Sequence, residues 1–229
     1  MTRPRIALLG RFTESASALR YRGVVSSRAL LDLIWAAGGD PVTLLPGAEP
    51  DALDWGARLR GFDGVVLAGG GDIDPARYGG DAEHESVYDV DAVQDESDLT
   101  LAAHCLENAI PTFAVCRGLH IVNVVRGGTL IVDMDENHRH VVQRVLLEAE
   151  ASTMGLSGDS VEISCYHHQA IDRLGSGLRI VSSAEDGTPE AVLIDADGWA
   201  AGVQWHPEDT WSNDPQQVSL MAAFIEAAR

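Results

Sequence analysis

The sequence has 229 residues, 45% of them hydrophobic and 22% charged, which is typical of a globular chain with an ample core. Acidic residues outnumber basic ones by 35 to 16, so the net charge of -19 disfavours nucleic acid and anionic lipid as partners. No apolar run approaches the about 20 residues of a membrane helix, and the N-terminal apolar run is too short for a signal peptide.

In chain order, the first half alternates short apolar strands with helical patterns. We expect strands at 5–9, 41–45, 64–68 and 111–115, and helices at 26–37, 52–59 and 91–108. Such alternation implies right-handed crossovers and an α/β fold with a doubly wound, mostly parallel sheet.

The second half reads as short strands separated by turn residues, followed by a closing helix. The expected strands are 141–147, 161–164, 179–183, 191–194 and 199–204, and the helix is 214–228. We interpret the strands as antiparallel additions to the same sheet. Because the chain shows no linker, repeat or low-complexity tract, we expect a single domain over residues 1–229.

Three widely spaced cysteines, Cys105, Cys116 and Cys165, form no CxxC pair. This set favours neither a disulfide framework nor a structural zinc site, and it suits a reducing cytoplasm. Cys105 lies on the apolar side of the helix expected at 91–108 and should be packed. Cys116 ends an apolar strand, precedes a helical segment and is followed two residues later by Gly118.

This strand–turn–helix pattern indicates a nucleophile elbow at Cys116, although it lacks the Gly-x-Ser-x-Gly of hydrolases. The positive end of the following helix would favour the thiolate. The alternative is a buried core cysteine, the commonest fate of this residue type.

A base and its orienting carboxylate are available in "GVQWHPED", residues 202 to 209. In an extended segment, His206 and Glu208 point the same way, so the carboxylate can hold the imidazole. Taken alone, this segment would more often be a surface loop. With a cysteine at a strand end, it completes a plausible triad.

The stretch "LAGGGDIDP", residues 67 to 75, contains three glycines at the end of an expected central strand. No phosphate-loop pattern is present, so we expect the backbone N–H groups to form an oxyanion hole with that of Arg117. The alternative for each glycine is a tight turn.

Together these segments resemble the class I glutamine amidotransferase-like superfamily, and within it the gamma-glutamyl-gamma-aminobutyrate hydrolase family. The matching motifs are "AGGDPVTLLP", "LAGGGDIDPARYG", "AVCRGLHIVNVVRGGTL", "YHHQAI", "GTPEAV" and "GVQWHPE", in that order. They cover nearly the whole chain. Each motif alone is weak to moderate, but their order is specific.

The resemblance implies roles for individual residues. Cys116 would be the nucleophile, His206 the general base and acid, and Glu208 the orienting carboxylate. Gly70, Gly71 and the backbone of Arg117 would form the oxyanion hole. A substrate-facing loop would consist of Tyr166, His167, His168 and Gln169.

The reaction implied is hydrolysis of a small-molecule gamma-glutamyl amide through a thioester, with no metal or organic cofactor. Three functions remain open: a free-standing gamma-glutamyl hydrolase, a glutaminase subunit supplying ammonia to a synthetase, and a catalytically silent binding protein. The sequence does not identify the leaving amine or the oligomeric state, and a homo-oligomer stays open.

Two positions depart from the family pattern. The elbow usually reads Cys-x-Gly-x-Gln, but here the last position is His120, which would either contact the substrate or pack under the elbow. If it contacts the substrate, we expect it to ionise near the ordinary histidine pKa of about 6.5. The helix before the nucleophile usually carries an Arg-Asp pair in this family, and here the same two positions are Gln94 and Asp95.

Four histidines outside the expected triad could in principle hold a metal. These are His138, His140, His167 and His168, whose spacing matches no known metal pattern. We expect His138 and His140 to lie in a solvated loop, and no metal site.

Overall fold

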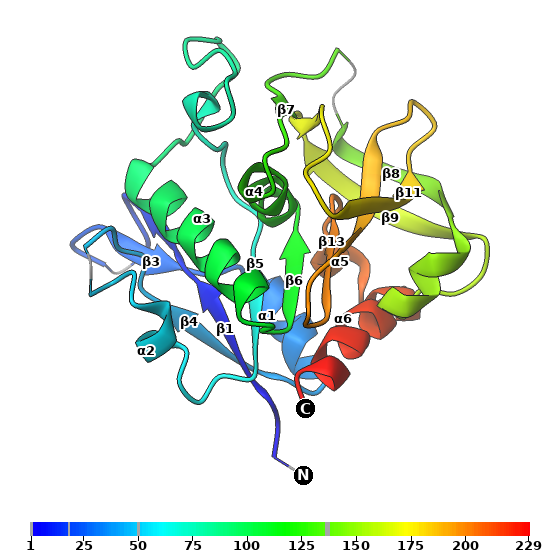
Figure 1. Cartoon of the computed structure of the whole chain (residues 1–229), viewed down its shortest axis with the longest axis horizontal. Coiled ribbons are helices and arrows are strands. Elements are labelled where there is room, and N and C mark those ends of the chain that lie inside the picture. The colour runs from blue at the N-terminus through cyan, green and yellow to red at the C-terminus, as the bar shows by residue number, and fades with distance from the viewer. Residues whose placement is uncertain (1, 18, 50, 136–137) are drawn as a thin grey trace.

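A nine-stranded mixed sheet runs through the computed structural model, which describes residues 2–17, 19–49, 51–135 and 138–229. Its strand order is β4-β1-β5-β6-β13-β12-β11-β8-β9 (Figure 1). The strands that pair in parallel are β1 (Arg5–Leu9), β4 (Asp40–Leu44), β5 (Gly64–Leu67), β6 (Thr112–Val115) and β13 (Ala200–Val203). The expected α/β sheet is therefore confirmed.

The antiparallel half of the sheet begins at the pairing of β13 with β12. It contains β12 (Pro189–Ile194), β11 (Leu178–Ser183), β8 (His138–Leu147) and β9 (Ser160–His167). Strand β13 itself was expected among the antiparallel additions, and that expectation was wrong. It forms a hairpin with β12, but its other edge pairs in parallel with β6, from Ala200 opposite Thr112 to Val203 opposite Val115.

Two small two-stranded sheets were not predicted. They are β2 (Arg11–Thr13) with β3 (Gly23–Val25), and β7 (Leu130–Ile131) with β10 (Ala170–Ile171). Both involve strands of two or three residues, which are too short to carry a periodic pattern.

Helices cover both faces of the sheet. They are α1 (Arg28–Ala36), α2 (Trp55–Arg58), α3 (Ala92–Glu107), α4 (Arg117–Val125), α5 (Pro207–Thr210) and α6 (Pro215–Ala227), with 3-10 turns η1 (Pro75–Arg77) and η2 (Ala149–Met154). Figure 1 shows α3 and α4 crossing in front of the parallel strands. Among the described residues, no helix combines the length and apolar character needed to cross a membrane.

Strand β1 shows why the core has two layers. Its residues point alternately to opposite faces of the sheet. Ile6 and Leu8 pack with α1 and α6, whereas Ala7 and Leu9 pack with α2, α3 and α4. An apolar strand covered on both faces reads as a continuous apolar run, which is how it was identified in the sequence.

Capping side chains explain where two long helices begin. Asp91 accepts hydrogen bonds from the backbone N–H groups of Val93 and Gln94 at the start of α3. Asp214 accepts one from Gln216 at the start of α6, which has proline in its first turn. These caps satisfy donors that have no partner within the helix.

The three strands β5, β6 and β13 are neighbours and end at the same edge of the sheet. Ligands of open α/β sheets bind at this carboxyl edge. The segments that follow the three strands carry the glycines 69–71, Cys116 and His206, so residues far apart in the sequence meet there.

Candidate active site

Cys116 occupies the junction between β6 and α4 with an unusual backbone. Its φ is 50° and its ψ is -108°, a positive φ that a residue with a side chain rarely adopts. Its N–H donates to the carbonyl of Val203 at 2.8 Å, and its carbonyl accepts from the N–H groups of Leu119 and His120. Such strain is typical of functional sites and costs about 1–3 kcal/mol.

The His206 imidazole lies against Cys116 above Gly69. A Cβ atom on Gly69 would lie 2.9 Å from His206 Cε1 and 3.7 Å from the Cβ of Cys116, so only glycine fits there. The other side of the ring is held by Glu208, whose Oε1 lies 2.8 Å from His206 Nδ1. Cysteine, histidine and glutamate are therefore brought together by the structure.

The pKa of His206 is set by opposing effects. Burial would lower it, but the neighbouring Cys116 sulfur and the Glu208 carboxylate stabilise the imidazolium and raise the pKa well above its ordinary value. This environment suits a protonated His206 beside the Cys116 sulfur at neutral pH.

The local geometry of His206 and Glu208 differs from the extended segment expected. His206 is extended, with φ -105° and ψ 91°, but Glu208 lies in the first turn of α5. Pro207 starts that helix, because its fixed φ suits the first helical position. The N–H of His206 donates to the carbonyl of Ser164 at 2.8 Å, which ties this turn to β9.

Gly70, Gly71 and Arg117 line the same small pocket as Cys116. The N–H groups of the two glycines take part in no hydrogen bond within the described ranges of the chain. The N–H of Arg117 is at the first position of α4, where a helix offers no partner. These donors can therefore face an oxyanion.

The Arg117 side chain points away from the pocket, towards α3. It is buried and pairs with Asp95 at 2.6 Å and with Asp98. Burial alone would lower the pKa of this guanidinium, but Asp98 and Asp95 raise it. Asp95, the residue next to the unusual Gln94, thus holds the start of α4 through its ion pair with Arg117.

The loop expected to face the substrate lies over Cys116. The pocket is lined by Tyr166, His167, His168 and Gln169, together with His120, Asp72 and Tyr88. His168 lies between two carboxylates: its Nε2 is 3.1 Å from Asp72 Oδ1 and its Nδ1 is 2.8 Å from Asp133 Oδ1. The hydrogen bond to Asp72, with that to Asp133, raises the pKa of His168.

His120 lines the pocket but does not ionise near neutral pH, which corrects our expectation. It is buried, and its Nε2 lies 2.7 Å from Gln204 Oε1. Burial lowers the pKa of His120 to about 3. It is therefore a neutral hydrogen-bonding group.

Gln204 is a fully buried residue next to the pocket that sequence reasoning missed. Its Nε2 lies 3.8 Å from the sulfur of Cys116, while its Oε1 contacts His120. A polar side chain that follows the fully buried strand β13 was the available signal, because such groups are rare in cores unless they are hydrogen-bonded.

The expectation of a solvated loop at His138 was wrong. His138 begins β8, is buried, and contacts Glu190 and Asp186. His140 also lies on β8, but it is exposed and its ring lies 4.6 Å from that of Tyr166. The loop was misread because these consecutive polar residues begin β8, the strand next to the edge strand β9.

Comparison with known proteins gives one family and several relatives. The Peptidase C26 family description matches residues 6–208. The gamma-glutamyl-gamma-aminobutyrate hydrolase PuuD of Escherichia coli (strain K12) is 29% identical over 221 residues, covering 87% of this chain and 84% of the relative. A Mycobacterium tuberculosis protein with the provisional name glutamine amidotransferase is 33% identical over 205 residues, covering 85% and 65%.

Two further comparisons concern another relative and the fold. The protein NtpR of Enterococcus hirae is 30% identical over 213 residues, covering 87% of each chain. The crystal structure of a glutamine amidotransferase from Thermotoga maritima matches with a TM-score of 0.66 and 14% identity, covering 100% of this chain and 99% of that one.

Proposed function

The chain belongs to the Peptidase C26 family of glutamine amidotransferase-like hydrolases, as its motifs predicted, and we propose that it is a cysteine-dependent hydrolase of gamma-glutamyl amides. One observation carries the proposal: Cys116 stands at a strained strand–helix junction beside a histidine that Glu208 holds by its far nitrogen. This is the relation of nucleophile, base and orienting group that acyl transfer requires.

The proposed reaction follows from the positions of these groups. The Cys116 thiolate attacks the side-chain carbonyl carbon, and the resulting oxyanion accepts hydrogen bonds from backbone N–H groups of Gly70, Gly71 and Arg117. The carbon–nitrogen bond breaks as the His206 imidazolium gives its proton to the leaving amine. Neutral His206 then takes a proton from water, which attacks the thioester and releases glutamate and the thiolate.

The pocket beside Cys116 supports a substrate with an amino-acid end. Asp72 offers a carboxylate and His168 an imidazolium within 3.1 Å of each other. A gamma-glutamyl group carries an ammonium and a carboxylate on one carbon, so this pair can complement both charges. Neutral His120 adds a hydrogen-bonding group rather than a charge.

A second cysteine, histidine and glutamate also lie together, namely Cys165, His167 and Glu190. We assign the nucleophile to Cys116 because Cys165 lies within strand β9 and is fully buried. His167 Nδ1, moreover, is engaged by the carbonyl of Gln169 rather than by a carboxylate.

A glutaminase subunit is the second candidate, since a Mycobacterium tuberculosis relative carries that kind of name. Glutaminases in this superfamily usually have glutamine at the last position of the elbow pattern Cys-x-Gly-x-Gln. In this chain that position is His120. The two functions differ in what happens without a partner protein. A free-standing hydrolase releases glutamate from amides with large amines, whereas a glutaminase subunit acts on glutamine and is expected to need its synthetase.

The test is to incubate the purified protein with a panel of gamma-glutamyl amides and with glutamine, and to measure glutamate. We expect release from the amides, abolished in Cys116→Ala and retained in Cys105→Ala, a buried cysteine outside the site. Mass spectrometry of quenched reactions should place the acyl adduct on the Cys116 peptide. No release from the amides, with or without release from glutamine, would favour the glutaminase, and an adduct on Cys165 would overturn the assignment of the nucleophile.

A further inference from the structure

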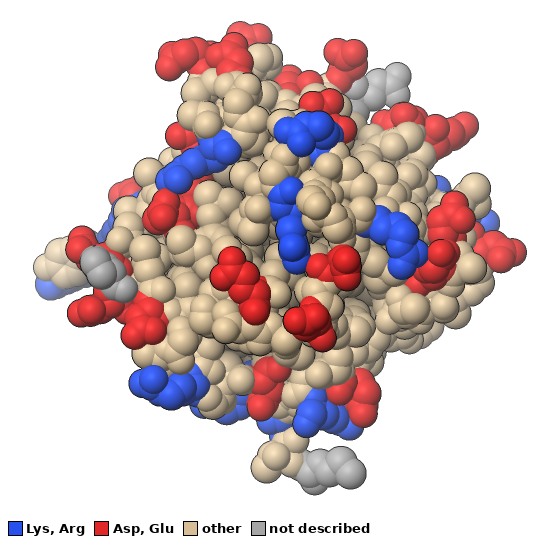
Figure 2. Space-filling view, viewed as in Figure 1, with Lys and Arg blue, Asp and Glu red and all other residues tan. Residues whose placement is uncertain are grey.

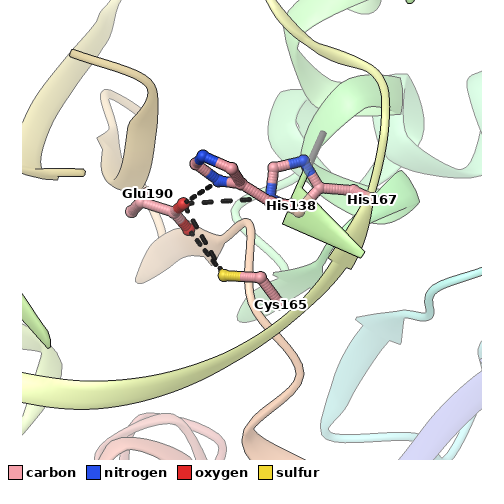
Figure 3. Close-up of side chains that lie close together, drawn as sticks. All are labelled: His138, Cys165, His167 and Glu190. Carbon is pink, nitrogen blue, oxygen red and sulfur yellow. Dashed lines mark hydrogen bonds and ion pairs between the residues drawn. The ribbon is translucent and has the colours of Figure 1, made fainter. Parts of the chain in front are cut away.

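Beneath the pocket lies a buried group of four side chains that the proposed reaction does not use. They come from β8, β9 and β12, and we call them the β9 cluster: His138, Cys165, His167 and Glu190. Figure 3 shows His138, Cys165 and His167 gathered around the Glu190 carboxylate. Each of the four residues is less than 9% exposed.

The donor atoms of the β9 cluster stand at the spacing of metal ligands. Glu190 Oε1 lies 3.2 Å from His138 Nδ1, 3.8 Å from His167 Nε2 and 3.7 Å from Cys165 Sγ. With bonds of about 2.0–2.3 Å to zinc, the corners of a tetrahedron are about 3.3–3.8 Å apart. All four donor atoms lie within 4.8 Å of one another, so closure by about 1 Å suffices.

The surroundings of His167 suit a cation at the β9 cluster. Its Nδ1 lies 3.0 Å from the carbonyl oxygen of Gln169, which can only accept, so Nδ1 carries the proton. In the neutral ring, Nε2 is then a lone pair, and it is buried without a hydrogen-bond partner. This lone pair faces the Glu190 carboxylate, which also only accepts. Two acceptors face each other across 3.8 Å, a contact that a cation between them would relieve.

His138 shows the arrangement that surrounds metal-bound histidines. Its Nδ1 faces the cluster, while its Nε2 lies 3.1 Å from Asp186 Oδ2, outside the cluster. A metal-ligating histidine commonly donates its other N–H to a carboxylate, which fixes the tautomer. Gln143 Nε2 lies 3.7 Å from the Cys165 sulfur and can donate to it.

We propose that the β9 cluster is a structural metal site that binds one zinc ion. Thiolate and imidazole ligands favour zinc, and a fourth ligand from a carboxylate leaves no open position for catalysis. The thiolate and the carboxylate balance the charge of the ion, so the buried site is neutral overall. On binding, the Cys165 thiol releases its proton to solvent.

The site would fasten the substrate loop to the antiparallel half of the sheet. Cys165 and His167 are on β9, directly before the pocket residues His168 and Gln169, and Glu190 is on β12. Strand β11 lies between β12 and β8 in the sheet, but it pairs with β8 only around Ser182 and Ser183. The ion would therefore connect β8 to β12, which are not hydrogen-bonded to each other.

The test uses cobalt as a spectroscopic probe for zinc. The Cys116→Ala protein, in which the nucleophile cannot compete, is freed of metal by chelation and titrated with cobalt chloride. We expect one equivalent to bind with tetrahedral visible bands and a thiolate-to-cobalt charge-transfer band, both removed by zinc chloride. Cys165→Ser, made in the same background, should lose the charge-transfer band, and His167→Gln should weaken binding by about 100-fold.

Matched controls are a second buried cysteine and a second histidine of β8. Cys105→Ser and His140→Asn, in the same background, should bind cobalt as the parent does. If Cys165→Ser does not fold, Asp186→Asn tests the proposal in its place. Loss of the carboxylate that holds a metal-bound histidine should weaken cobalt binding by about 10- to 100-fold. Zinc should raise the melting temperature of the metal-free protein.

Three results would overturn the proposal. One is no cobalt or zinc binding by folded protein, which would leave His138 as an imidazolium paired with Glu190 and Asp186. Another is cobalt bound without a charge-transfer band. The third is a band that persists in Cys165→Ser. None of these measurements depends on hydrolase activity, so failure of the proposed function would not affect them.

Discussion

Cys116 differs from the other two cysteines in its surroundings. It lines the pocket next to His206, whereas Cys105 and Cys165 are fully buried in the core. Burial raises the pKa of Cys105 to about 12 and also raises that of Cys165. Only one of the three thiols therefore has both access to solvent and a cation beside it.

We accordingly expect brief iodoacetamide treatment to alkylate Cys116 first. Peptide mass mapping should show the adduct on the Cys116 peptide, with activity lost in step. Cys105 and Cys165 should react only after unfolding in urea. Inactivation with the label on Cys165, and Cys116 intact, would mean that the wrong cysteine has been assigned.

Glu208 is proposed to orient His206 without taking its proton. Its Oε1 is 2.8 Å from His206 Nδ1. We expect Glu208→Gln to retain measurable turnover, reduced by about 10²- to 10⁴-fold. Removing an orienting group lowers activity less than removing the nucleophile or the base. Cys116→Ala and His206→Asn should be almost inactive. Steady-state kinetics on folded proteins checks this order, and equal loss in all three variants would contradict it.

Because His120 is buried as a neutral ring, it should affect the pH dependence of stability rather than the recognition of substrate charge. Its pKa is about 3 in the folded protein and about 6.5 when unfolded. The unfolded state therefore binds more protons between these values, so the stability that His120 contributes is complete above about pH 6.5 and is lost as the pH falls.

Replacing His120 removes this dependence. Between about pH 7 and pH 5, His120→Gln should lose about 2 kcal/mol less free energy of unfolding than the parent protein. Urea unfolding at each pH measures the difference, and the histidines with raised pKa values cancel because both proteins share them. Parallel pH profiles for the two proteins would show that His120 is not buried as a neutral ring. The pH dependence of KM should be the same in both.

At the scale of elements, the site depends on close contact between α4 and β5. A Cβ atom on Gly118 would lie 2.1 Å from the carbonyl oxygen of Leu67 and 2.7 Å from its carbonyl carbon. Both are backbone atoms of the strand end, which cannot turn aside as a flexible side chain can. The glycine of the elbow is thus required by packing against β5.

We expect Gly118→Ala to lower the free energy of unfolding by about 3 kcal/mol, because α4 must move away from the sheet. The matched control is Gly56→Ala in α2, where the nearest atoms to a new Cβ are 3.7 and 3.9 Å away. It should be neutral or stabilising by up to about 1 kcal/mol. Urea denaturation followed by tryptophan fluorescence compares the two. A Gly118→Ala protein as stable as Gly56→Ala would refute this packing argument.

The molecule as a whole carries a net charge of -19. Figure 2 shows acidic side chains over much of one face, with fewer basic ones between them. Such an excess repels itself in the compact state and opposes folding. Salt shortens the range of this repulsion, from about 10 Å at 0.1 M to about 3 Å at 1 M.

Sodium chloride should therefore stabilise the protein. We expect the midpoint of urea unfolding to rise between about 0.05 M and about 1 M salt, with an unchanged urea dependence. Potassium chloride should act equally, because screening depends on ionic strength and not on a bound ion. A midpoint that falls with salt would show that attractive ion pairs outweigh the net repulsion.

Most of the elements, and the family, could be predicted from the sequence. Periodic apolar patterns are local, so they located β1 at Arg5–Leu9 and placed β5 and β6 within a residue of their observed bounds. The positions of Cys116 and His206 after strands could be predicted for the same reason. Motifs in the right order were enough for the Peptidase C26 family, since a resemblance needs no coordinates.

Which side chains face each other, and what surrounds them, could not be predicted from the sequence and depends on how the chain folds. The parallel pairing of β13 with β6, the pairing of Arg117 with Asp95, and the contact of His138 with Glu190 all join residues distant in the sequence. The low pKa of His120 likewise results from burial by other elements. Strand partners and desolvation arise from long-range packing, which no local pattern of residues encodes.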